Sequence, residues 1–73
     1  MAYCIKTYDA EDVAKAATSE LESRGIRATY DYSEFVEKWC VRVVNQDDAR
    51  AAYNHLQFNP SLVLARLRQL KEV

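Results

Sequence analysis

The chain has little of what most catalytic and metal sites are built from. Its 73 residues include one histidine, one glycine and two cysteines. Cys4 and Cys40 stand outside any CxxC or Cys/His ligand spacing, and the single Gly25 cannot form a phosphate-binding loop. His55 has no sequence neighbour that marks it as a catalytic base, so we interpret it as a surface histidine. We therefore expect no bound metal, no cofactor and no enzymatic activity.

Long apolar runs and disordered stretches are missing as well. No run approaches the length of a signal or membrane segment. Hydrophobic residues make up 49% of the chain and charged residues 29%, which is typical of globular chains. A chain of 73 residues has room for one thin core. We predict a single domain over residues 1–73, with two free thiols in a reducing cytoplasm and no membrane contact.

A strong excess of charge of either sign is also lacking, because the net charge is −1. Residues 60–73 are nevertheless basic, since they hold Arg66, Arg68 and Lys71 against Glu72. An acidic body with a short basic end is not typical of generic nucleic-acid binding. We interpret the three cations as an outward helix face, which is either only solvated or meets an acidic surface or RNA.

Alternation and helical spacing predict three strands and three helices. The strands are expected at residues 2–8, 26–31 and 39–44. Asp9 is expected to cap a helix ending at Arg24, Asn45 a second helix, and Pro60 begins a third that reaches about Lys71. Their inward residues are expected to be Ala10, Val13, Ala17 and Leu21, then Ala49, Ala52, Tyr53 and Leu56, then Val63, Leu64, Leu67 and Leu70.

This order of elements predicts an α+β fold. It corresponds to a three-stranded, ferredoxin-like βαββ-α half with strand order 1-3-2 and an extra C-terminal helix. The strand at 39–44 is the most apolar and belongs in the centre. Residues 32–38 are expected to form an open hairpin loop, and the first strand an unpaired edge that an extended partner segment could join.

One face of the predicted sheet has no helix to cover it. If Ile5, Val41 and Val43 face the helices, that open face exposes Lys6, Tyr8, Arg27 and Arg42 beside Cys4, Thr29, Cys40 and Val44. Such a face can be a solvated surface, a nucleic-acid platform or a protein dock. The two thiols, which should share this face, indicate either simple packing or a redox or soft-metal pair.

The predicted hairpin carries the second group of candidate contacts. Tyr32 and Phe35, with Val36 and Trp39, are residue types that anchor protein interfaces, or else they close the end of the core. The full set of candidate partner-binding residues is Lys6, Tyr8, Arg27, Tyr32, Phe35, Arg42, Arg66, Arg68 and Lys71.

Two resemblances bear on function. The succession of residues 9–25, 26–30 and 39–41, then Asn45–Arg50 leading to Asn59–Pro60, resembles the cytosolic N-terminal domain of bacterial rhomboid proteases and small domains described as signal-transducing. That resemblance implies a cytosolic sensory or oligomerising domain.

In length and character the chain also resembles small lytic-phage regulators of host RNA polymerase. It starts at Met1, reads as a complete small reading frame and is near neutral. That resemblance implies binding to the N-terminal region of the polymerase β′ subunit, displacement of σ, inhibition of initiation and antitermination in the host cytoplasm. It carries over no site residue. A protein-binding regulator of this kind, monomeric when free, is our first interpretation, the sensory or oligomerising domain the second and an RNA-binding module the third.

Overall fold

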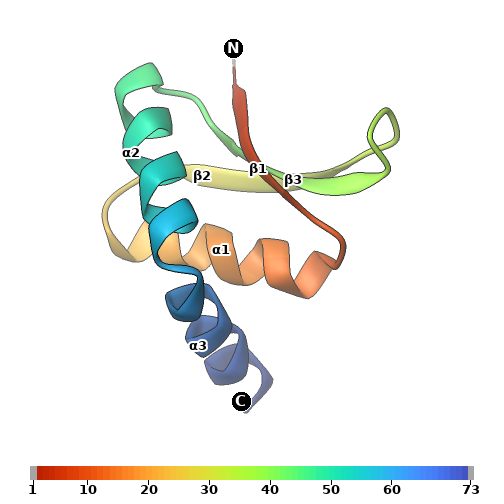
Figure 1. Ribbon diagram of the computed structural model, residues 1–73, viewed down its shortest axis with the longest axis vertical. Helices are drawn as coiled ribbons and strands as arrows, with labels where there is room; N and C mark the ends of the chain where they lie inside the picture. The colour runs from red at the N-terminus through yellow and green to blue at the C-terminus, as the bar shows by residue number, and fades with distance from the viewer. Residues whose placement is uncertain (1, 73) are drawn as a thin grey trace.

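Three strands and three helices follow one another in the predicted order. The computed structural model describes residues 2–72. Its elements are β1 (Tyr3–Tyr8), α1 (Glu11–Ser23), β2 (Ala28–Ser33), β3 (Lys38–Val43), α2 (Gln46–Phe58) and α3 (Pro60–Lys71) (Figure 1). The strands form one antiparallel sheet in the order β1-β3-β2. The predicted α+β fold with strand order 1-3-2 and an extra C-terminal helix is confirmed.

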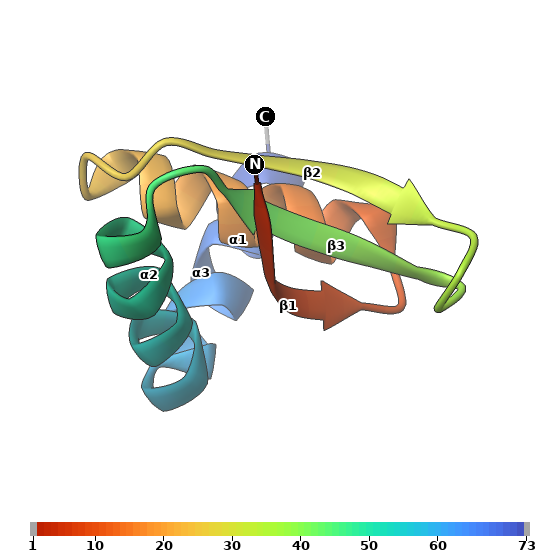
Figure 2. The same cartoon turned by 90° about the horizontal axis from the view of Figure 1, so that it is seen from above.

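The helices lie on one side of the sheet in two layers. Helices α1 and α2 contact the strands, and α3 forms the outer layer. Figure 2 shows α1 running beneath β2 and β3, with α2 crossing near β1. Helix α3 lies mainly against α1 rather than against the strands. The opposite sheet face carries no helix from residues 2–72, as the sequence predicted.

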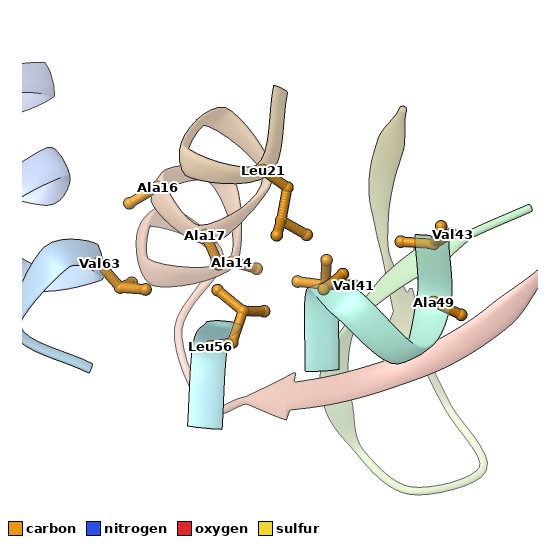
Figure 3. Packing of buried hydrophobic residues seen from close by; sticks show 10 residues of the cluster. Ala14, Ala16, Ala17, Leu21, Val41, Val43, Ala49, Leu56 and Val63 are labelled. Atoms are coloured by element: carbon orange, nitrogen blue, oxygen red, sulfur yellow. The ribbon is translucent and has the colours of Figure 1, made fainter. Parts of the chain in front are cut away.

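The core is thin and rich in alanine. Leu21, Val41 and Val43 are its largest fully buried side chains. Ala16 and Ala17 are both fully buried although they are neighbours on α1, because the sheet covers one side of this helix and α3 the other. Figure 3 shows Ala16 directed toward Val63 of α3, while Ala17 lies on the side of Leu21 and Val41. Small side chains let the three layers approach closely.

Local capping chemistry defines two of the helix starts. The Asn45 side chain accepts hydrogen bonds from the backbone N–H groups of Asp47 and Asp48, at 2.9 and 3.3 Å, and Pro60 opens α3. The prediction for α1 is wrong in detail. Its N-cap is Ala10, with no side-chain cap bond, because the Asp9 carboxylate instead accepts from Lys38 Nζ at 3.0 Å.

The hairpin is tighter than predicted. β2 continues to Ser33 and β3 begins at Lys38, so the loop is Glu34–Glu37 and the predicted open loop over 32–38 is wrong. Cross-strand pairing extends the strands because Tyr32 packs edge-on against Trp39, with ring centroids 5.4 Å apart. Glu37, at φ 56°, ends the turn.

Several residues predicted to face inward are exposed. Tyr53, Leu64 and Leu70 all keep substantial surface, and Ala10 is exposed as well. The reason for the two leucines is that α3 rests mainly on a single helix, so only a narrow stripe around Val63 and Leu67 is covered. The other predicted inward residues of α2, which are Ala49, Ala52 and Leu56, are buried.

Candidate protein-binding surfaces

A β-bulge in β1 decides which way its side chains point. Cys4 pairs with Arg42, yet Lys6 pairs with Val41, so Ile5 is an extra residue between two neighbouring pairs. Paired residues of an antiparallel sheet share a face, and Val41 faces the helices. Lys6 and Tyr8 therefore lie on the helix side. The prediction that they lie on the open face with Arg27 and Arg42 is wrong, because simple alternation does not survive the bulge.

Lys6 and Tyr8 line a groove between the β1 edge and the helices. This edge groove has a volume of about 330 Å³. Its walls are mainly apolar, and its complete lining is Lys6, Tyr8, Val13, Leu56, Gln57, Pro60, Val63 and Leu64. Lys6 Nζ donates to Gln57 Oε1 at 3.3 Å, which holds the cation at the rim. Leu64 is 54% exposed, so a large apolar side chain is open to contact there.

Arg27 and Arg42 lie together at a hollow on the opposite side. This open-face hollow, of about 420 Å³, is lined by both guanidinium-bearing residues and by Thr29 and Val44, together with Glu22, Gly25, Ile26 and Ala28. Arg42 Nε donates to the Asp31 carboxylate at 2.8 Å, and this bond raises the pKa of the guanidinium. Arg42 stays charged, but its charge is balanced by Asp31 within the fold, which lowers its attraction for an anionic partner.

The two thiols share the open face, as predicted. Cys4 is exposed and Cys40 is buried at the centre of the sheet. Burial raises the pKa of the Cys4 thiol to about 11, and a hydrogen bond with Cys40 adds to the rise. Such a thiol is mostly uncharged at neutral pH and is a poor nucleophile or metal ligand. Within residues 2–72, no three His, Cys, Asp or Glu side chains gather as a metal site.

The hairpin tip is an isolated apolar projection. Phe35 is 98% exposed and Val36 is also open to solvent. Tyr32 is about half exposed and packs on Trp39. The tip projects from the end of the sheet opposite α2 (Figure 2). The expected contribution of Tyr32 and Phe35 to partner binding stays a prediction.

The basic C-terminal segment is less free than predicted. Arg66 Nη2 donates to Glu20 Oε2 at 3.1 Å, and Lys71 Nζ lies 3.2 Å from the Asp12 carboxylate. The prediction that Arg66 points outward is wrong, because the buried Glu20 draws it onto α1. Arg68 is exposed. The segment therefore uses two of its three cations to attach α3 to the body.

Glu20 is a polar centre that the sequence analysis missed. Its side chain is only 8% exposed, and besides Arg66 it accepts from His55 Nε2 at 3.2 Å, with Arg24 Nε 3.6 Å away. One carboxylate thus joins α1, α2 and α3. His55 is 12% exposed at its side chain, so its interpretation as a surface residue is wrong. The sequence does contain one signal of the burial of Glu20. Ala16 and Glu20 are four residues apart, so they lie on one side of α1, which is a different side from the one that faces the sheet.

Comparison of the chain with protein-family models, with curated proteins and with solved structures gave no match. The candidate sites consequently depend on this chain's own geometry.

None of the helices within residues 2–72 combines the length with the apolar run that spanning a bilayer needs.

Proposed function

We propose that this chain is a non-enzymatic regulator that acts in the cytoplasm by binding another protein through the edge groove. The observation that carries the proposal is the groove itself, an apolar hollow of about 330 Å³ open to solvent beside an unpaired strand edge. Interface anchors are large apolar or aromatic side chains that fill such pockets.

The groove chemistry favours a particular kind of partner segment. Val63, Leu64 and Pro60 offer an apolar floor, and Lys6 stands at the rim with a neutral partner, Gln57. A partner segment with one bulky apolar residue next to a carboxylate would fill the apolar floor and form an ion pair with Lys6. Continuous strand addition along β1 receives little support, because the bulge at Ile5 leaves only a short regular stretch.

Bacterial RNA polymerase is the partner we propose to test first. This choice depends on the resemblance in length and character to small phage regulators, and on no residue of the groove. The proposed consequences are contact with the N-terminal region of β′, displacement of σ, inhibited initiation and antitermination.

The experiment titrates purified polymerase core with the labelled chain and measures the fluorescence anisotropy. Leu64→Glu places a charge on the apolar floor, and Lys6→Glu reverses the rim charge. Phe58→Glu is the matched control, because Phe58 is 76% exposed and lies outside the groove lining. We expect Leu64→Glu to weaken binding by at least tenfold, as loss of an interface anchor does. Equal affinity for all variants would contradict binding through the edge groove. No binding of polymerase would contradict the proposed partner.

The two other functions stay open as outcomes of related assays. An oligomerising domain is favoured by the second open edge of the sheet, at β2. An RNA-binding module has less support, since Arg42, Arg66 and Lys71 all form ion pairs within the chain. RNA binding that competes with the protein partner would reverse this order.

A further inference from the structure

The outer edge of β2 is open and has neither a bulge nor a basic residue to protect it. All six residues from Ala28 to Ser33 pair with β3 without a bulge, and the strand contains no Pro, Lys or Arg. Among residues 2–72 no other strand pairs with this edge. Edge strands are normally protected by bulges or basic residues, as β1 is by its bulge and Lys6. β2 is therefore the edge suited to pair with another strand.

Helix α1 runs beside this edge with a self-complementary charge pattern. Lys15, Ser19 and Glu22 follow one another at helical spacing and line one shallow hollow, of about 240 Å³, together with Tyr30 and Leu70. Opposite charges thus lie at its two ends. Neither Lys15 nor Glu22 forms an ion pair within residues 2–72.

We propose that two copies of this chain pair through β2, antiparallel and about a two-fold axis at Tyr30. In that register Thr29 lies opposite Asp31 of the second copy, so a hydroxyl meets a carboxylate that also accepts from Arg42 of its own chain. Ala28 lies opposite Tyr32 of the second copy, so a small side chain makes room for a large one. Two three-stranded sheets would become one sheet of six strands.

Other registers that keep the buried faces aligned fit less well. A shift of the axis to Asp31 places two carboxylates directly opposite each other. Although each is paired with its own Arg42, this is less favourable than a hydroxyl opposite a carboxylate. A shift to Thr29 removes the Ala28–Tyr32 contacts and shortens the paired stretch. The register centred on Tyr30 pairs residues 28–32 of each copy and is the one that combines this paired stretch with complementary neighbours.

The helix layer obeys the same symmetry. Tyr30 and Ser19 line one hollow, so an axis at Tyr30 passes beside Ser19. Lys15 of each copy then faces Glu22 of the other copy, twice per dimer. A foreign strand would satisfy β2 but leave these charges unpaired, and for this reason we assign the edge to a second copy. The edge groove, at the other side of the sheet, stays accessible, and the inference does not depend on the proposed function.

The primary test is sedimentation equilibrium of the full chain from micromolar to millimolar concentration. A monomer–dimer equilibrium is expected, in place of the monomer expected from the sequence. Thr29→Asp sets two carboxylates against each other and should raise the dimer dissociation constant roughly tenfold, whereas Thr29→Lys should lower it. Thr7→Asp on β1 is the control and should change nothing. Circular dichroism reports whether each variant is folded.

A charge exchange on α1 tests the second layer. Lys15→Glu and Glu22→Lys should each weaken the dimer, and the double variant should restore it, while Arg50→Glu on α2 should have no effect. A monomer at millimolar concentration overturns the inference. So does a dimer whose dissociation constant is the same for all folded Thr29 and α1 variants, because such a dimer uses another surface.

Discussion

Replacing Glu20 by glutamine should destabilise the fold far more than replacing any exposed carboxylate. The side chain accepts hydrogen bonds from His55 and Arg66 at 3.2 and 3.1 Å, and it is 8% exposed. Glutamine keeps the shape and one acceptor oxygen but loses the charge. Arg66 would then lie beside a neutral amide instead of a carboxylate.

The magnitude follows from how deeply each partner is buried. Removing one member of a fully buried ion pair costs about 3–5 kcal/mol. Arg66 is 30% exposed and can regain water, and glutamine still accepts one hydrogen bond, so about 2–3 kcal/mol is expected here. The total stability of a chain of this length is roughly 4–11 kcal/mol. The melting temperature should therefore fall by about 10–20 °C.

The assay is urea unfolding followed by circular dichroism, at several pH values. Burial alone would raise the pKa of Glu20. The hydrogen bonds from His55 and Arg66 together outweigh this effect, so the folded-state pKa lies below its ordinary value of 4.5. The ionised carboxylate therefore contributes stability above pH 4.5, and this contribution is lost as the pH falls through the folded-state pKa. The difference between wild type and Glu20→Gln should shrink accordingly in acid.

The control is Glu34→Gln in the hairpin turn, which should change the free energy of unfolding by less than about 0.5 kcal/mol. If Glu20→Gln resembles this control, or if its deficit is independent of pH, the carboxylate does not join the three helices as described.

Three further measurements address other parts of the chain. Truncation after Asn59 removes Arg66 and the cover of α1, so thermal melting should show a loss of at least about 3 kcal/mol; unchanged melting would mean that α3 is not docked. Alkylation of Cys4 by iodoacetamide, followed by intact mass, should be slow at pH 8 and accelerate toward pH 11; fast labelling at pH 8 would contradict its raised pKa. Gly25→Ala should cost about 1–2 kcal/mol in urea unfolding, because φ is +81° and nothing else lies near an added Cβ, whereas Gly25→Asn should cost less. An equal cost for both substitutions would refute the conformational explanation.

The element order was predictable because local chemistry and periodicity agree along most of the chain. Asn45 and Pro60 begin helices through interactions within one turn, and β3 is recognisably the most apolar strand. Asp9 shows the limit of such reasoning. Its carboxylate could accept either from the free backbone N–H groups at the start of α1 or from Lys38, which is distant in the sequence. In the structure it accepts from Lys38.

The candidate site was only partly predictable. The alternation of β1 continues smoothly through Ile5 and Lys6, so no local signal reports the bulge; it exists only in the pairing with β3. Glu20 was also missed, because a carboxylate on a helix is normally exposed and only its spacing from Ala16 indicates a second covered side. Its burial requires a third layer, and the position of α3 in that layer depends on contacts between distant segments.

The bulge at Ile5 also bears on whether assembly stops. A subunit with two straight, open edges can add neighbours at both sides without limit, which gives a growing sheet, whereas one usable edge gives a closed pair. The bulge in β1 interrupts the regular spacing of backbone hydrogen-bonding groups along one of the two edges. Because Cys4 and Lys6 already pair with the adjacent residues Arg42 and Val41, a chain lacking Ile5 could keep every existing pair. Such a chain could still fold, but Lys6 alone would then protect the β1 edge against the addition of further copies beyond a dimer.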